Sequence, residues 1–210
     1  MSILPKLRPM RLSLRSKPFD SDDWIFELKQ DGFRALAFIE DGTCRLVSRN
    51  GHTFRKFGEL CANIAGSIRA HNAVLDGEIV CLDSTGRSVF NDLMFRREGD
   101  CYFYAFDLLF ANGEDVRGLP LIDRKRRLRK LIPRKPSSLL YVDHVERRGC
   151  ELFASICRMD LEGIVAKRKD SLYRATDKPS PDWIKIKNPS YSQAEGRQEM
   201  FEKLAVSRNG

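Results

Sequence analysis

The sequence has no run of about 18 apolar residues among its 210 residues, so no segment is expected to cross a membrane. Its first residues show no apolar core followed by a small-residue cleavage site, so a secretory signal is not expected. Glycine, with 14 residues, is too scarce for a collagen-like rod, and no long heptad run indicates a coiled coil. These absences favour a cytoplasmic, intracellular protein, associated with the nucleoid if its source is bacterial.

The six cysteines form no Cys-x-x-Cys motif, and the three histidines add no metal-ligand spacing to them. A zinc site or a disulfide framework is therefore not expected, and we predict reduced, buried thiols. The cysteines are Cys44, Cys61, Cys81, Cys101, Cys150 and Cys157.

The composition instead supports a globular chain with a full core. Hydrophobic residues make up 42% and charged residues 31%, which excludes a disordered tail. The length allows one domain of about 200 residues, or at most two small ones. Lys and Arg number 37 against 29 Asp and Glu, a net charge of +8 that suggests a polyanionic partner such as nucleic acid.

Strand and helix patterns are mixed without strict βαβ alternation. Residues 24–48 are predicted to form a three-stranded antiparallel meander, because Asp-Gly turn signals separate three strand-like segments. Further strands are expected at 73–83, 101–110, 139–145, 163–168 and 182–188, and helices at 57–71, 89–96, 123–132, 149–159 and 194–206. This mixture favours an α+β fold with antiparallel β-sheets flanked by helices.

Lys29 ends a predicted strand directly before a tight turn. Gly32 lets the main chain bend and lets a ligand approach closely, and Arg34 returns on the partner strand. Two cations in one pocket suit a phosphate. On this hexapeptide alone, a hairpin with two solvated basic residues is an equally good interpretation.

Further candidates follow along the chain. Arg49 lies at a turn, Glu78 follows a glycine within a strand, and Glu162 precedes a strand. Lys185 and Lys187 alternate with isoleucines, so they share one strand face while Ile184 and Ile186 face a core. Taken singly, the two carboxylates are surface residues and the lysines a solvated face.

Two other features favour structural interpretations when taken alone. Phe106 lies among other aromatic residues of a buried strand and is best explained as core. The basic helix predicted at 123–132 carries six cations outside a Leu and Ile stripe. We predict a solvated face for these cations, with contact to DNA phosphates as the second interpretation.

Together and in this order, these segments resemble the nucleotidyltransferase motifs of ATP-dependent DNA ligases and of their relatives, the RNA ligases and mRNA-capping enzymes. The resemblance covers the chain from about Pro9 to Asn188. The segments at 106–109, 119–121 and 162–167 resemble the DNA ligase branch most, especially the ligase modules of bacterial end-joining enzymes. It implies the nucleotidyltransferase (ATP-grasp-like) catalytic core of a DNA ligase.

The resemblance also implies a role for each site residue. Lys29 would attack the α-phosphate of ATP, expel pyrophosphate and carry AMP as a phosphoramidate. The AMP would then pass to a 5′-phosphate of nicked or broken duplex DNA, which the 3′-hydroxyl attacks, a reaction that serves DNA repair and recombination. Mg²⁺ would be bound by Glu162 together with Glu78.

The remaining roles concern nucleotide and phosphate contacts. Glu27 would lie beside the adenine, Phe106 would stack on it, and Glu78 would accept a hydrogen bond from the ribose. Arg34 and Arg49 would hold ribose and phosphate oxygens, including the DNA 5′-phosphate. Lys185 and Lys187 would neutralise the charge that builds in the transition state.

The chain departs from the family pattern in two places. An OB-fold domain usually follows the Trp-x-Lys-x-Lys strand. Here we expect a single adenylation domain over 1–210, with an extended lead-in at 1–20, a C-terminal helix at 190–210 and no OB-fold domain, as a monomer that a separate OB-fold or end-joining protein could assist. A Gly-Arg pair usually precedes Trp183, and Lys178 or Arg174 are the candidates to replace its Arg.

Two alternatives remain open at this stage. The substrate could be RNA ends or a GTP-derived cap, as in the related ligases and capping enzymes. The chain could also be a non-catalytic nucleotide- or DNA-binding module that lacks its OB-fold partner.

Overall fold

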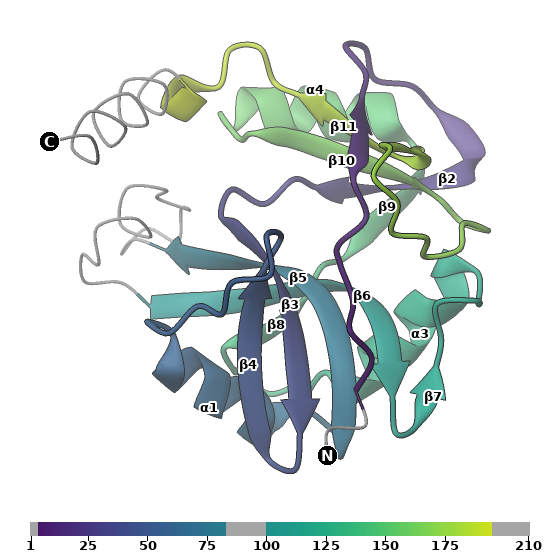
Figure 1. Ribbon diagram of the computed structural model, residues 1–210. Coiled ribbons are helices and arrows are strands. Elements are labelled where there is room, and N and C mark those ends of the chain that lie inside the picture. Colours follow the sequence, from purple (N-terminus) through teal and green to yellow (C-terminus); the bar gives the residue numbers. More distant parts are fainter. Residues whose placement is uncertain (1–3, 83–99, 195–210) are drawn as a thin grey trace, which may run out of the picture.

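The computed structural model describes residues 4–82 and 100–194. Its strands form two sheets, one above the other in the view of Figure 1. The helices predicted at 89–96 and 194–206 lie outside the described residues, apart from Ala194. No helix in the described part of the chain is both long and apolar enough to cross a bilayer.

The first sheet has five strands, and it lies at the top of Figure 1. Its order is β1 (Leu12–Leu14), β11 (Ser180–Lys187), β10 (Gly163–Arg168), β2 (Ser21–Leu28) and β9 (His144–Arg147). Neighbouring strands are antiparallel except for β1 and β11. The helix α4 (Gly149–Arg158) covers its outer face.

The second sheet is built around two long strands in the middle of the chain. Its order is β4 (Thr43–Ser48), β3 (Phe33–Glu40), β5 (Asn72–Leu82), β6 (Asp100–Ala111) and β7 (Glu114–Asp115), with β8 (Leu139–Tyr141) parallel to β6. The helices α1 (Gly58–Ser67) and α3 (Leu121–Leu131) pack against it, and a short 3₁₀ helix, η1 (Ser192–Ala194), lies near the end of the described chain. The α+β class predicted from the sequence is confirmed.

The predicted meander over 24–48 is wrong. The strand β2 pairs with β10 and β9, whereas β3 pairs with β4 and β5, so the chain crosses from one sheet to the other at residues 29–32. An Asp-Gly signal marks a change of direction but does not say which strands pair afterwards. Residues 139–145 likewise divide into β8 and β9, which belong to different sheets.

Gly32 is needed at this crossing for a reason beyond those that the sequence analysis gave. A Cβ atom on this residue would lie 2.0 Å from the carbonyl oxygen of Ile79 in β5. The close approach is therefore made by the protein's own backbone, and only glycine allows it.

Three apolar clusters hold the layers together. One packs the outer face of the five-stranded sheet against α4 and includes Phe26, Ile164 and Ile186. A second lies between the sheets and includes Trp183 and Tyr173. The third joins the six-stranded sheet to α1. The predicted core role of Ile186 is confirmed.

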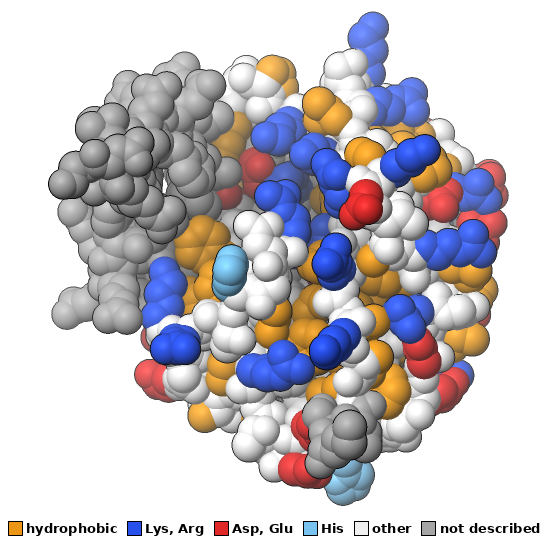
Figure 2. All heavy atoms as spheres, in the orientation of Figure 1, with side chains coloured by type: hydrophobic (Ala, Val, Ile, Leu, Met, Phe, Trp, Pro, Cys, Tyr) orange, Lys and Arg blue, Asp and Glu red, His pale blue; other side chains and the backbone are white. Residues whose placement is uncertain are grey.

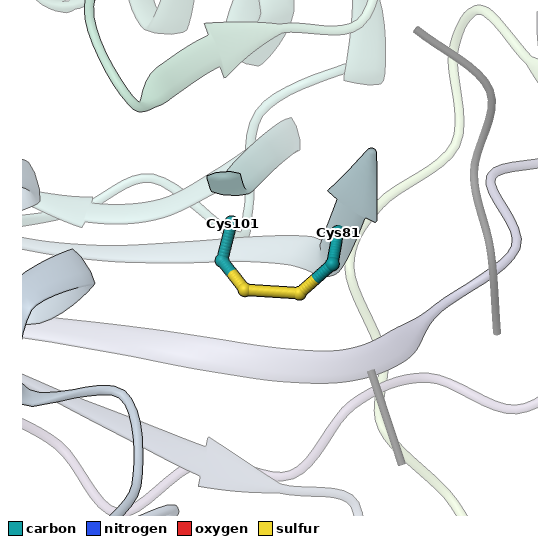
Figure 3. The surroundings of a disulfide bond; sticks show 2 residues. All are labelled: Cys81 and Cys101. Carbon is teal, nitrogen blue, oxygen red and sulfur yellow. A yellow bond between two sulfur atoms is a disulfide. The ribbon is translucent and has the colours of Figure 1, made fainter. Parts of the chain in front are cut away.

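The prediction of reduced, buried thiols is wrong for Cys81 and Cys101, which are oxidised, and for Cys150, which is exposed. Cys81 and Cys101 form a disulfide that joins β5 to β6 (Figure 3). Their spacing of 20 residues matches no motif, but the antiparallel register places them directly opposite each other. Of the four free cysteines, Cys150 is exposed.

Candidate active site

A cavity of about 470 Å³ opens between the two sheets. In Figure 2, Lys and Arg side chains gather across the middle of the face shown. Seven of the predicted site residues line the cavity: Glu27, Lys29, Arg34, Arg49, Glu78, Phe106 and Lys185. Residues more than 150 positions apart in the sequence are thus brought to one place.

Strand alternation explains why the cavity wall is charged. Successive side chains of a strand point to opposite faces. On β2, Glu27 faces the cavity while Phe26 packs toward α4, and on β11, Lys185 faces the cavity while Ile186 packs toward α4. The same strands therefore provide an apolar outer face and a polar inner one.

Lys29 is held beside Glu162 by both backbone and side chain. Its ammonium donates to Glu162 Oε2 at 2.8 Å, and its backbone N–H donates to the carbonyl oxygen of Gly163 at 2.9 Å. Gly163 has a φ of +145°, and a Cβ there would lie 2.2 Å from the Ile186 carbonyl oxygen. The glycine after Glu162 therefore lets β10 approach β11 while Glu162 faces the lysine.

Further charged side chains surround this pair, and we call Lys29, Arg49, Glu78, Glu162 and Lys185 the Lys29 cluster. Burial lowers the pKa of Lys185, and its cationic neighbours, Lys187 first, lower it further. Three cations face two carboxylates, so the cluster has an excess of positive charge that suits an anion. Lys187 is exposed and is absent from the cavity wall.

Glu78 differs from an ordinary surface carboxylate. Burial raises its pKa to about 7, against the lowering effect of Lys29 and Arg34, and Glu162 adds to the increase. A carboxyl group with this pKa exchanges its proton near neutral pH. Glu78 therefore responds readily to a bound cation or to a hydroxyl donor.

A second cluster, which we call the Glu27 cluster, consists of Glu27, Lys125 and Lys167. Glu27 Oε1 lies 2.5 Å from Lys125 Nζ, and Glu27 Oε2 lies 2.6 Å from Lys167 Nζ. All three side chains are at most 2% exposed. Lys167 Nζ also lies 4.1 Å from the ring centroid of Phe106 and 4.0 Å from that of Trp183.

Phe106 lies at the edge of the core rather than within it. It is partly buried, lines the cavity and packs edge-on against Trp183 with a centroid distance of 6.0 Å. Its ring is thus available to a planar ligand, and the interpretation as plain core does not describe it fully.

Arg34 makes protein contacts that the sequence did not predict. Its Nε and Nη2 donate to the two carboxylate oxygens of Asp76 at 3.1 and 2.7 Å, and its Nη1 donates to the Met10 carbonyl oxygen at 2.7 Å. Tyr173 also donates to Asp76, at 2.7 Å. Arg34 thus ties the N-terminal lead-in to β5 while it lines the cavity.

The basic helix also differs from its prediction. Arg124 and Lys125 of α3 are buried, whereas Arg126, Arg127, Arg129 and Lys130 are exposed. Arg124 donates from Nε and Nη2 to Asp107 at 2.9 and 2.8 Å. The solvated-face prediction is therefore wrong for the first two cations, because buried carboxylates on both sheets require partners.

The two candidates for the missing arginine do not line this cavity. Arg174 and Lys178 are exposed and lie on a separate hollow of the surface. Arg11, which the sequence analysis did not single out, lines the cavity from the N-terminal lead-in, and its guanidinium donates to the Asp177 carbonyl oxygen. No local motif marks Arg11, because it reaches the site only through the pairing of β1 with β11.

Lys167 and Trp183 also line the cavity without a predicted role. The sequence does contain a pattern that indicates the direction of the Lys167 side chain. Ile164 and Ala166 alternate with Val165 and Lys167, as Ile184 and Ile186 alternate with Lys185 and Lys187. In the described part of the chain, no group of three His, Cys, Asp or Glu side chains is arranged to hold a metal ion. The carboxylates of the Lys29 cluster are two hard oxygen donors that fit a partly hydrated Mg²⁺.

Comparison with known proteins identifies a matching family and relatives. The family model of the ATP-dependent DNA ligase domain matches residues 12–187. The chain is 37% identical over 187 residues to the Pseudomonas aeruginosa "Multifunctional non-homologous end joining protein LigD", across 86% of this chain and 22% of that protein. It is 33% identical to the Bacillus subtilis "Bifunctional non-homologous end joining protein LigD", across 85% of this chain and 34% of that protein.

Solved structures agree with these matches. A mycobacterial DNA ligase D complexed with ATP and MES has a TM-score of 0.75 at 32% identity, covering 86% of this chain and 60% of that chain. The Chlorella virus DNA ligase-adenylate has a TM-score of 0.60 at 15% identity, which shows a shared fold. The chain spans about a fifth of the Pseudomonas relative and a third of the Bacillus one.

Proposed function

The chain belongs to the ATP-dependent DNA ligase domain family, and on this premise we propose that it is the catalytic core of an ATP-dependent DNA ligase acting in DNA repair. Its substrate is nicked or broken duplex DNA. The observation that carries the proposal is the position of Lys29, which lines a cavity beside Glu162 and among cations.

The first step uses the Lys29 amine as nucleophile. Once Lys29 Nζ has given up a proton, its lone pair attacks the α-phosphorus of ATP, a P–N bond forms, and the bond to pyrophosphate breaks. Glu162 Oε2, at 2.8 Å, is the oxygen that this Nζ faces and so holds the amine in place. Arg49 and Lys185 stabilise the negative charge of the phosphates as the amine approaches.

Two later steps join the DNA ends. The DNA 5′-phosphate displaces Lys29 from the AMP, and the 3′-hydroxyl then displaces AMP to form the phosphodiester. Arg49, an exposed residue of the cavity wall, binds the 5′-phosphate, because a guanidinium binds phosphate oxygens in pairs. Lys187, next to Lys185 on the same strand face, extends the cationic surface toward solvent.

We assign the base and sugar to the other residues of the cavity. Phe106 stacks on the adenine, Glu27 lies beside it, and Glu78 accepts a hydrogen bond from the ribose. Arg34 lines this part of the cavity, with three of its donors already engaged by the protein. Glu162 and Glu78 would hold Mg²⁺, which would supply positive charge against the phosphates.

The pathway is inferred from the relatives. The names of the Pseudomonas and Bacillus proteins refer to non-homologous end joining. We therefore propose that broken DNA ends are the natural substrate, and that an OB-fold or end-joining partner contributes to DNA binding.

A label-transfer experiment tests the function. The protein is incubated with Mg²⁺ and with ATP or GTP labelled at the α-phosphate, denatured, and assayed for bound label. We expect acid-labile label from ATP on the wild type and none on Lys29→Ala. The labelled protein is then given nicked duplex DNA or nicked RNA, and sealing of DNA is expected.

The other outcomes identify the alternatives. Label from GTP would indicate a capping-type enzyme, and sealing of RNA alone would indicate an RNA ligase. Absence of label with both nucleotides across pH 6–9, with nucleotide still bound, would leave a binding module and overturn the proposal.

A further inference from the structure

Lys125 acts on the cavity from outside it. It lies on α3, it is 1% exposed, and it is absent from the cavity wall. Its ammonium nevertheless reaches Glu27 Oε1 at 2.5 Å and donates to the Val142 carbonyl oxygen at 3.0 Å. Glu27 lines the cavity, so Lys125 directly contacts a residue of the site.

The Glu27 cluster contains two cations and one carboxylate, all buried. Each oxygen of Glu27 contacts a different lysine, Oε1 to Lys125 and Oε2 to Lys167. This arrangement fixes the plane of the carboxylate from two sides. A carboxylate has about four acceptor positions, so Glu27 keeps capacity for another donor from the cavity.

An ionised carboxylate takes only one role in a hydrogen bond. It accepts hydrogen bonds and donates none, whereas its protonated form can donate. A purine with an amino group at position 6 offers a donor there, and a purine with an oxo group offers an acceptor. An ionised Glu27 therefore favours the first and repels the second, and a site with a buried polar group discriminates strongly.

We propose that Lys125 is a positioning residue that holds Glu27 as an acceptor-only carboxylate, and thereby sets the preference of the site for a 6-amino purine over a 6-oxo purine. This inference rests on the proposed function, since it takes the nucleotide to bind beside Glu27.

The charges around Glu27 support this assignment. Burial raises the pKa of Glu27, but Lys125 and then Lys167 outweigh that effect, and the pKa is lowered overall. From β9, His144 lies opposite Glu27 in the strand register and feels its charge. Asp107 acts on Lys125 and Lys167, and Tyr141 interacts with both Lys125 and Glu27. Lys125 is thus the leading cation in the balance that keeps Glu27 ionised.

The same helix provides a matched control. Arg124, the neighbour of Lys125, is 0% exposed and pairs with Asp107 on β6, a residue that is absent from the cavity wall. Replacing Arg124 removes a buried cation from α3 as well, but leaves the contacts of Glu27 in place.

The experiment compares ATP with inosine triphosphate, whose base carries an oxo group at position 6. The rate of lysyl-nucleotide formation is measured with Mg²⁺ for the full chain, for Lys125→Met, Lys125→Arg and Arg124→Met. We expect Lys125→Met to lower the ATP-to-ITP ratio of kcat/KM by about tenfold or more, Lys125→Arg to restore much of it, and Arg124→Met to keep the wild-type ratio at reduced thermal stability.

The outcomes separate the two proposals. If the wild type forms no lysyl-nucleotide, the proposed function fails and this inference with it. If the wild type reacts but the ratio is unchanged in Lys125→Met, or falls equally in Arg124→Met, the inference alone is overturned. Should Lys125→Met not fold, Glu27→Gln decides, because its amide offers both a donor and an acceptor: an unchanged ratio in that variant also overturns the inference.

Discussion

The Glu27 cluster and the Lys29 cluster both bring cations to carboxylates beside the cavity, yet they differ in burial and in charge pairing. In the Glu27 cluster, both lysines contact the one carboxylate and all three side chains are buried. In the Lys29 cluster, Lys29 is 22% exposed, and further cations lie around its ion pair with Glu162. The first arrangement suits an uncharged, planar base, and the second suits phosphates that arrive and leave.

The sharpest test of this contrast removes one lysine from each cluster. Lys29→Ala is expected to reduce lysyl-AMP formation to background, because no other group takes the place of the nucleophile. Lys167→Ala also removes a cavity lysine paired to a glutamate, but is expected to leave measurable label from ATP. Equal loss in both variants would contradict the division of roles, and label transfer is the measurement.

The Glu27 cluster should contribute more to the stability of the fold than the Lys29 cluster does. Glu27→Ala leaves two buried ammonium groups without their carboxylate, and we expect a loss of about 3–5 kcal/mol in the free energy of unfolding. Lys185→Ala removes a cation from among like charges, and we expect a change within about 0.5 kcal/mol. Urea denaturation of both variants measures the difference, and similar losses would show that the Lys29 cluster is also structural.

Phe106 lies between the clusters and tests where the base binds. Phe106→Ala is expected to weaken ATP binding by about 1–3 kcal/mol, because base stacking is lost. Phe106→Leu is the control: it keeps apolar volume against Trp183 and should preserve stability, but it too lacks the stacking ring. Calorimetric titration gives the affinities. Unchanged ATP affinity in both variants would show that Phe106 is an ordinary core residue with no role in binding the base.

Glu78 provides a pH signature of the Lys29 cluster. Its pKa is raised from 4.5 to about 7 by burial. Between these two values the folded protein binds more protons at Glu78 than the unfolded chain does, so stability falls as the pH rises through this window. Glu78→Gln does not titrate at this position and should remove this fall, which is about 3 kcal/mol for a shift of this size.

The control for this pH series is Glu59→Gln, on the exposed first turn of α1. It should keep the wild-type dependence of unfolding free energy on pH. A Glu78→Gln profile that runs parallel to the wild type would show that Glu78 is not the group responsible.

The sequence predicted the Lys29 cluster better than the Glu27 cluster, and the reason is physical. Lys29 and Glu162 lie in short motifs at strand ends, and Lys185 lies within a strand of strict alternation, so turns and alternation fix the side-chain directions locally. Lys125 lies in a run of six cations on a helix, and nothing in that run shows which of them are buried. That choice depends on Glu27 and Asp107, which come from distant strands.

The fold was likewise predicted correctly where local patterns decide the structure and incorrectly where distant segments decide it. The strands at 163–168 and 182–188 were predicted nearly at their observed bounds, because their apolar alternation is strong. The pairing of β2 was mispredicted, because a turn signal at 31–32 does not carry information on which sheet the next strand joins. The Cys81–Cys101 disulfide and the entry of Arg11 into the cavity also depend on register between distant segments.

One measurement tests the central claim most directly. The wild-type chain is incubated with ATP and Mg²⁺, and its peptides are mapped by mass spectrometry under conditions that preserve phosphoramidates. We predict a mass gain of one AMP on the peptide that contains Lys29, reversed by added pyrophosphate. An AMP found on Lys185 or on any other lysine, or no AMP at all on a chain that binds ATP, would contradict the account.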